Sequence, residues 1–480
     1  MTKRRLVGAV AVLGLALAAR LVWLSDEFNV NEPDELMHVS IAERFAGGTL
    51  YPRYDPGGYR DGLWTVPALV LYCGGAVFRV FGASLWHFRL MSVGFGLAGV
   101  AAFYAFSGLY LKGVPRLVAV LLFAFSPLSL YGTTLAMLGF PSLVFLLTGL
   151  WAYVRYHREG RRRDLVVCAL MLGATAATKH YGLLLGGLIV VHWCWVRVLE
   201  GGPPLRGLAA VLGLALGTFI VLEPWVLWRP RDAVHCYLYR LFVSHLVALV
   251  RGQRGSGSLF GVPYPELVVA HGLVGLVGLV AFVATWRRRW DAAGFYAVLL
   301  GVPILAFRET RYLSLSLPIF CLFAGYLVAV VGEAGRRSRL ARVGNGVLVA
   351  MLVGSLVPVS VVPWRPRSGL VEACRFVAEH TAPDDQVVTN YWRPIVERFT
   401  GRRVASEWLD GESRRRIEGG GVRFVILDGS QYTRRVLHTP ERAAAAAWVR
   451  RTFPAVWSPH GEARGGTTVY ATGGGGSGGG

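Results

Sequence analysis

The sequence predicts a polytopic α-helical membrane protein of about 11 spans, or about 11 to 13 at the outside, with short juxtamembrane helices in its first outer loop and a small C-terminal α/β domain. Hydrophobic residues make up 54% of the 480 residues and charged residues 16%, a composition typical of multi-span proteins. Apolar runs near the length that crosses a bilayer recur between Leu6 and Val362. After Trp364 the pattern changes to that of a soluble domain.

The apolar runs lie near residues 6–24, 63–81, 88–110, 116–133, 138–155, 165–178, 181–198, 207–227, 266–285, 292–307, 312–331 and 343–363. The first run follows Lys3, Arg4 and Arg5, as the apolar part of a signal peptide would. It is too long for one, and no convincing cleavage site follows it. We therefore expect it to be a retained first span with a cytoplasmic N-terminus.

The net charge of +21 is concentrated in short arginine-rich connections between apolar runs. Such clusters mark the cytoplasmic side of a membrane protein, so they indicate a topology rather than nucleic acid as a partner. They place the loops 25–62 and 228–265 and the C-terminal domain outside, as expected for a plasma (inner) membrane protein. The basic connection after residue 111 is inside only if one earlier run does not cross. We expect that run to be 63–81, which contains Pro67, Gly74 and Gly75.

The last part of the chain alternates between helix and strand signals. Residues 371–380 and 441–451 have the pattern of helices, and residues 386–390 and 423–429 that of strands. This alternation predicts a small α/β domain. The predicted division is therefore a transmembrane domain at 1–363, an extracytoplasmic α/β domain at 364–472 and a Gly/Ser tail at 473–480.

The stretch NEPDELMH places three carboxylates and a histidine just after the first span. Asn31 suits an N-cap, Pro33 a first turn, and Asp34 and Glu35 complement a helix N-terminus. This pattern alone is equally typical of an interfacial helix with an acidic cap. On a helix the adjacent Asp34 and Glu35 point about 100° apart, so both cannot face one reacting atom, whereas His38 follows Asp34 by one turn on the same face.

Several short motifs resemble one known family. The run DELMHVSIAER (34–44) and the PDE at 33–35 followed by GYRDGLW (58–64) come in the first outer loop, TK stands at 178–179, and RETRYL (308–313) precedes Pro318. In order and predicted sidedness they resemble the GT-C superfamily of membrane glycosyltransferases, within it the protein O-mannosyltransferase and aminoarabinose transferase branch. The resemblance covers most of the membrane part.

This resemblance implies a GT-C-like fold and inverting transfer of a sugar from a polyprenyl-phosphate donor to an acceptor on the outer face. Asp34 would be the general base, and Glu35 would orient the acceptor or the loop. The leaving phosphate needs cationic partners, for which the outer side offers Lys179, Arg308, Arg311 and Arg60. Supporting roles fall to His38, Asp61, Glu309, His180 and Tyr181.

Each of these assignments has a structural alternative. Lys179 either binds phosphate or extends to the interface beside its aromatic neighbours. The group at 308–311 is either a phosphate site or an internal ion-pair group, and Asp61 is either a second carboxylate of the site or the partner of Arg60. The basic loop 228–265 would meet either the carrier's phosphate or anionic lipid heads.

No metal ligands are assigned. The second outer loop, YGTTLAMLGF at 131–140, has no acidic residue, and the pair Asp34-Glu35 supplies too few ligands for a site made by protein alone. A divalent metal therefore stays possible but doubtful. Two other functions also stay open, a transporter or flippase for lipids or lipid-linked sugars and a catalytically silent relative, and the acceptor is a protein, a glycan or a lipid.

Overall fold

The computed structural model describes most of the chain. The described residues are 3–24, 28, 34–54, 64–179, 181–201, 204–237, 317–335, 338–354, 369–407, 409, 411–429, 440–458 and 466–472. They form two compact units. The first comprises residues 1–26, 38–54 and 63–363, and the second comprises 27–37, 55–62 and 364–480.

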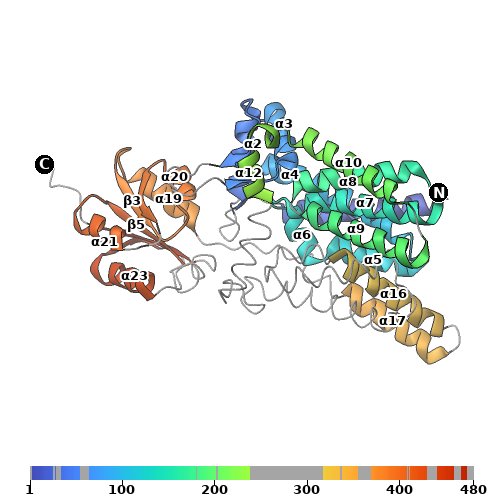
Figure 1. Ribbon diagram of the computed structural model, residues 1–480. Helices are drawn as coiled ribbons and strands as arrows, with labels where there is room; N and C mark the ends of the chain where they lie inside the picture. The colour runs from blue at the N-terminus through green and yellow to red at the C-terminus, as the bar shows by residue number, and fades with distance from the viewer. Residues whose placement is uncertain are drawn as a thin grey trace. The chain divides into compact units, whose positions relative to one another are not determined.

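The first unit is a bundle of helices, drawn in blue to light orange in Figure 1. Its helices are α1 (Lys3–Trp23), α2 (Asp34–Ala46), whose first residues belong to the second unit, α3 (Leu69–Phe81), α4 (Leu85–Ser107), α5 (Gly113–Phe125), α6 (Pro127–Thr133), α7 (Gly139–Glu159), α8 (Arg162–Thr178), α9 (Tyr181–Glu200), α10 (Leu205–Leu222), α11 (Trp225–Trp228), α12 (Pro230–Val234), α16 (Leu317–Gly335) and α17 (Arg339–Gly354). The short strands β1 (Arg53–Tyr54) and β2 (Trp64–Thr65) pair in antiparallel fashion. The core lies where α7 packs on α4 and α8, and where α16 packs on α5.

Three described helices are long and apolar enough to cross a membrane. They are Leu85–Ser107, Leu205–Leu222 and Leu317–Ala334, and the bent pair α5 and α6 would be a fourth if it forms one span. The runs 266–285 and 292–307 lie outside the described residues, so the count of about 11 spans stays a prediction.

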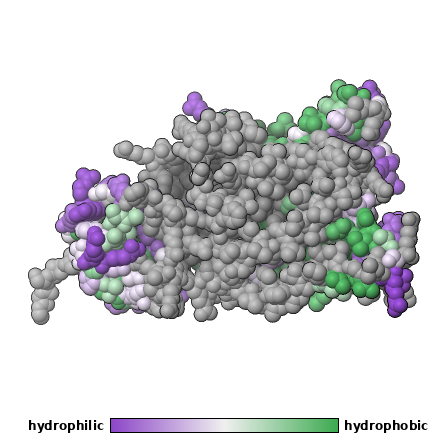
Figure 2. Space-filling view, turned by 90° about the horizontal axis from the view of Figure 1, so that it is seen from below, coloured by the Kyte–Doolittle hydropathy of each residue, from purple (hydrophilic) through white to green (hydrophobic). Residues whose placement is uncertain are grey.

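Exposed apolar side chains distinguish the first unit from a soluble bundle. Val22, Val198 and Val221 are 53%, 79% and 76% exposed. Among the described residues of the second unit, the one large hydrophobic side chain that is exposed is Val456. Figure 2 shows this contrast, with green patches over the helices and purple over the strand-containing unit. Apolar faces of this kind are suited to lipid rather than to water.

The predicted run 116–133 is two helices rather than one. The chain bends by 50° between α5 and α6. Pro127 lacks the N–H that would continue the helical ladder, and the Ser126 side chain caps the new helix by accepting from the Ser129 N–H at 3.1 Å. Pro127 therefore divides the apolar run 116–133 into two helices.

Helix α3 is short and packs tightly against α2. Its 13 residues make it about 20 Å long, less than the hydrocarbon thickness of about 30 Å. A Cβ on Gly74 would lie 3.2 Å from the Cβ of Ala42, and one on Gly75 would lie 2.7 Å from the Cβ of Phe45. The two glycines therefore let the helices touch through their backbones. This geometry suits a segment that does not cross the membrane by itself.

The second unit contains a mixed five-stranded sheet in the order β4-β3-β5-β7-β6. The strands are β3 (Gln386–Thr389), β4 (Arg403–Glu407), β5 (Phe424–Asp428), β6 (Ala455–Trp457) and β7 (Thr467–Ala471), and the helices are α19 (Leu370–Glu379), α20 (Arg393–Thr400), α21 (Gly411–Glu418) and α23 (Pro440–Thr452). β3, β4 and β5 are parallel, and β7 is antiparallel to β5 and β6. Val388, Val425 and Leu427 form the core with Ala446 and Val449 of α23.

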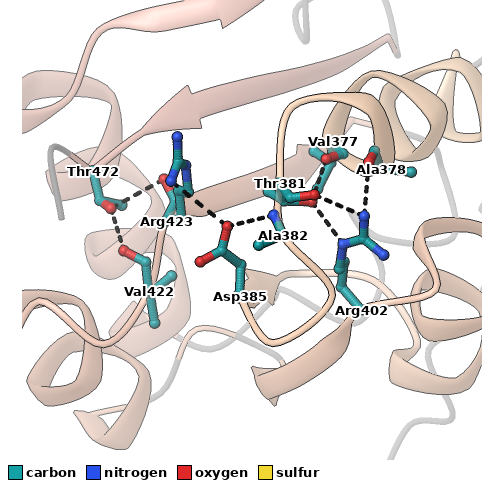
Figure 3. Close-up of polar contacts among 9 residues, drawn as sticks. All are labelled: Val377, Ala378, Thr381, Ala382, Asp385, Arg402, Val422, Arg423 and Thr472. Carbon is teal, nitrogen blue, oxygen red and sulfur yellow. Dashed lines mark hydrogen bonds and ion pairs between the residues drawn. The ribbon is translucent and has the colours of Figure 1, made fainter. Parts of the chain in front are cut away.

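A guanidinium fixes the end of α19 in this unit. Arg402 donates from Nε to the Thr381 hydroxyl and from Nη2 to the carbonyls of Ala378 and Thr381, each at 2.8 Å (Figure 3). The last carbonyls of a helix lack intrahelical partners and carry partial negative charge, so a cation there is favourable. Arg402 thus joins the helix end to the start of β4.

Candidate functional site

Helix α2 carries the acidic pair Asp34-Glu35 at its start. It begins at Asp34, so Asp34 and Glu35 occupy its first turn, where the helix dipole favours negative charge. The Glu35 side chain is fully buried, whereas Asp34 is half-buried. Asn31 and Pro33, expected to shape the helix start, lie outside the described residues. The two carboxylates therefore occupy different environments, and Asp34 is the more accessible.

His38 joins this helix to the segment that follows α6. Its ring is buried, and Nδ1 lies 2.7 Å from the carbonyl oxygen of Ala136. Because a carbonyl oxygen can only accept, this hydrogen bond requires the hydrogen on Nδ1. Ala136 follows the end of α6 by three residues. A contact between residues 98 positions apart thus links the acidic helix to the segment after α6.

Lys179 lies at a tight reversal between α8 and α9. Its backbone N–H donates to the Thr175 carbonyl at 2.9 Å and its own carbonyl accepts from the Gly182 N–H at 3.1 Å, and its side chain is half-buried. A Cβ on Gly182 would lie 2.2 Å from the backbone nitrogen of Ala176, so only glycine fits there. Lys179 is thus the residue at which the chain turns from one apolar helix into the next.

Several predicted site residues cannot be placed. Arg60, Asp61, His180, Arg308, Glu309 and Arg311 lie outside the described residues, as do the side chain of Tyr181 and residues 238–265 of the basic loop. The structure therefore brings Asp34, Glu35 and His38 together on α2 and places Lys179 at a separate helix junction. The roles proposed for the arginines stay predictions.

Sequence analysis missed Glu223, which it included in the apolar run 207–227. This carboxylate is fully buried just beyond α10. Its Oε1 accepts from the N–H groups of Ala68 and Leu69, at 2.5 and 3.1 Å, and its Oε2 accepts from the indole N–H of Trp225. Glu223 therefore caps the N-terminus of α3 from another element. Burial raises the pKa of its carboxyl from the usual 4.5 to about 8, against the effect of the three N–H donors, which lower it.

An aromatic cluster surrounds this cap. Trp225 packs against Tyr237 and against Tyr51, which lies between α2 and β1, with ring centroids 6.5 and 5.7 Å apart. The Tyr51 hydroxyl donates to Asp232, and the Arg229 guanidinium lies 5.7 Å from the Tyr51 ring centroid. These contacts join the segment after α2 to helices α11 and α12. In the sequence this cluster appears only as Glu223 and two tryptophans close to Pro224. A hydropathy average over the run 207–227 does not detect such single residues.

Arg20 was also missed, because it lies within the first apolar run. Its side chain is fully buried. It donates to the hydroxyls of Thr133 and Ser129 at 3.0 Å each, and to the carbonyls of Ala16 and Ala124 at 3.1 Å each. Within the described part of the chain these partners are all neutral. An arginine inside an apolar span is a signal for function or for a specific packing role.

The described residues contain no group of three or more His, Cys, Asp or Glu side chains arranged to hold a metal ion.

Residues 65–228 match the sequence model of the dolichyl-phosphate-mannose-protein mannosyltransferase family. No curated protein sequence matches the chain significantly.

Solved structures share the fold at low sequence identity. ArnT from Cupriavidus metallidurans, solved bound to undecaprenyl phosphate, is 16% identical with a TM-score of 0.61, over 96% of this chain and 97% of that one. The Archaeoglobus fulgidus oligosaccharyltransferase, solved with a tethered acceptor peptide, is 13% identical with a TM-score of 0.62, over 97% of this chain and 74% of that one.

Proposed function

We propose that the chain is a membrane glycosyltransferase of the GT-C type, which transfers a sugar, with inversion, from a polyprenyl-phosphate-linked donor to an acceptor on the outer face of the plasma membrane. Support comes from ArnT, which was solved with undecaprenyl phosphate, and from the oligosaccharyltransferase, which was solved with an acceptor peptide. A polyprenyl tail cannot leave the bilayer, so the reaction belongs at the interface where the loops meet the helix ends.

The observation that carries this proposal is the difference between the two carboxylates at the start of α2. Asp34 is half-buried and can meet an acceptor, whereas Glu35 is fully buried and cannot. We assign Asp34 as the base that takes the acceptor's proton, and Glu35 as the group that holds the loop. His38 fixes the next turn of the same helix through Ala136.

The leaving phosphate needs charge compensation rather than a proton. Lys179 is the described candidate, because it stands at the junction of two apolar helices, where a lysine is rarely retained without a role. Arg60, Arg308 and Arg311 are proposed as further phosphate partners, with Asp61, Glu309, His180 and Tyr181 in support. The acceptor is a protein, a glycan or a lipid.

The test is sugar transfer by the purified protein in a lipid bilayer, with polyprenyl-phosphate sugars as donors. Asp34→Asn should lower transfer at least about 100-fold, the usual contribution of a general base. Glu43→Gln is the matched control, because it removes a half-buried carboxylate farther along the same helix, and transfer should be unchanged. Full transfer by a folded Asp34→Asn protein would overturn the assignment. Movement of the lipid-linked sugar across the bilayer without transfer would instead favour a flippase.

A further inference from the structure

We propose that Arg20 is a positioning residue for this transfer: it fixes the second outer segment, residues 126–136, and through the contact of that segment with His38 it sets the position of Asp34. The proposal rests on the proposed function. Hydrogen bonds link three elements that are far apart in the sequence: the end of α1, the break between α5 and α6, and the start of α2.

The guanidinium of Arg20 holds the break between α5 and α6 together. Three of its four hydrogen bonds reach the last turn of α5, at Ala124, and two hydroxyls of α6, at Ser129 and Thr133. The fourth returns to Ala16 on its own helix. A planar fork with several donors in fixed directions can join such groups, whereas a single ammonium cannot. The relative orientation of α5 and α6 is therefore set by α1.

The charge is favourable at this place because of the break. Pro127 has no N–H, and the bend leaves carbonyls at the end of α5 without their usual helical partners. The C-terminus of a helix also carries partial negative charge. Arg20 satisfies the Ala124 carbonyl and lies at this negative end, which offsets part of the cost of burying a cation among neutral groups.

Helix α4 leaves the space that this arrangement needs. A Cβ on Gly96 would lie 2.7 Å from the Cβ of Thr133 and 2.9 Å from Nε of Arg20. Contacts that short do not occur, so any side chain at Gly96 must push the guanidinium or α6 aside. A Cβ on Gly94, on the same helix, would meet no atom within 4 Å. The chain thus offers a perturbing substitution and a matched control two residues apart.

A shift of residues 126–136 would be transmitted to the acidic pair through a single hydrogen bond. Ala136 follows α6 by three residues, and its carbonyl accepts from the ring of His38 at 2.7 Å. His38 lies one turn after Asp34 on α2. Because a helical turn is stiff, a shift of residues 126–136 carries through His38 to the carboxylate of Asp34. A misplacement of about 1 Å can cost about 100-fold in rate.

The experiment compares Gly96→Ala, Gly94→Ala and Arg20→Lys in the full-length protein in bilayers. Gly96→Ala and Arg20→Lys should lower kcat for sugar transfer by about 10- to 100-fold while leaving KM for the donor within about 2-fold. They should also speed amide hydrogen exchange in residues 34–46. Gly94→Ala should change neither quantity.

A double-mutant cycle separates positioning from general loss of stability. If Arg20 acts through His38, then His38→Ala combined with Gly96→Ala should be no slower than the slower single variant, because both break the same chain of contacts. Fold-changes that multiply would overturn the proposal. So would normal exchange in residues 34–46 when exchange in 126–136 is accelerated. If exchange in both segments responds but the wild type transfers no sugar, the proposed function fails while the link from Arg20 to α2 stands.

Discussion

Replacing Glu223 should test whether one buried carboxylate holds the N-terminal end of α3. In Glu223→Gln the amide oxygen still accepts from Ala68 and Leu69, but its NH₂ group then faces the Trp225 N–H, so two donors meet. The loss of one hydrogen bond with a buried donor left over costs about 1–3 kcal/mol. Glu223→Ala leaves all three donors without this acceptor and opens a cavity, so we expect a loss of at least about 3 kcal/mol.

A reporter for this region is already present. Cys236 is fully buried and packs against Trp225, so its labelling by a thiol-reactive dye measures opening of this cluster. Trp225→Phe removes the opposing N–H, and it should therefore cost at least about 1 kcal/mol less in the Glu223→Gln background than in the wild type. Trp228→Phe is the control, because Trp228 is 54% exposed and its replacement should change little.

The raised pKa of Glu223 also predicts how the stability of the protein changes with pH. Since the folded pKa of Glu223 is about 8 and the usual value is 4.5, the folded protein holds a proton between these pH values that the unfolded chain releases. Stability therefore falls as pH rises through this window, by up to about 1.4 kcal/mol per pH unit from this group. Glu223→Gln should remove that slope. The reasoning is refuted if the slope persists in Glu223→Gln, or if Glu223→Gln and Glu223→Ala destabilise equally.

Two further predictions concern other contacts. Arg402→Ala should destabilise the sheet-containing unit by about 1–3 kcal/mol, because three hydrogen bonds from a cation are lost. The rate at which a thiol-reactive dye labels the buried Cys374 measures this loss of stability. Arg403→Ala is the control, and equally slow labelling in the two variants would contradict the prediction. Gly75→Ala should force α2 and α3 apart by a few tenths of an ångström or more and lower the midpoint temperature of thermal unfolding. Gly187→Ala should leave that temperature unchanged, because a Cβ there meets no atom within 4 Å. Equal midpoints for the two variants would show that stability does not depend on the contact at Gly75.

Local patterns predicted much of the secondary structure. After residue 364 the expected segments 371–380, 386–390, 423–429 and 441–451 correspond to α19, β3, β5 and α23. Strands β4 and β7 were not expected. Their sequences, RVASE and TTVYA, carry weak signals alone, and their pairing with β3 and β5 is non-local.

The candidate site was predictable only where a motif was continuous. Asp34, Glu35 and His38 stand together in the sequence and on one helix. Arg20 and Glu223 each appear as one charge in an apolar run, and their partners lie up to 113 and 155 positions away. A hydropathy window averages such residues away, and only the folded chain shows what they bind.

The bonding of Arg20 has a consequence for how the protein is made. The guanidinium lies near the C-terminal end of α1, but its partners Ala124 and Thr133 come 104 and 113 positions later. At a synthesis rate of roughly 5–20 residues per second, α1 waits roughly 5–20 s before those partners exist. During that time the side chain must extend toward the headgroups for hydration. Its move into the bundle then becomes a late step of assembly, one that commits α1 only after α5 and α6 have arrived.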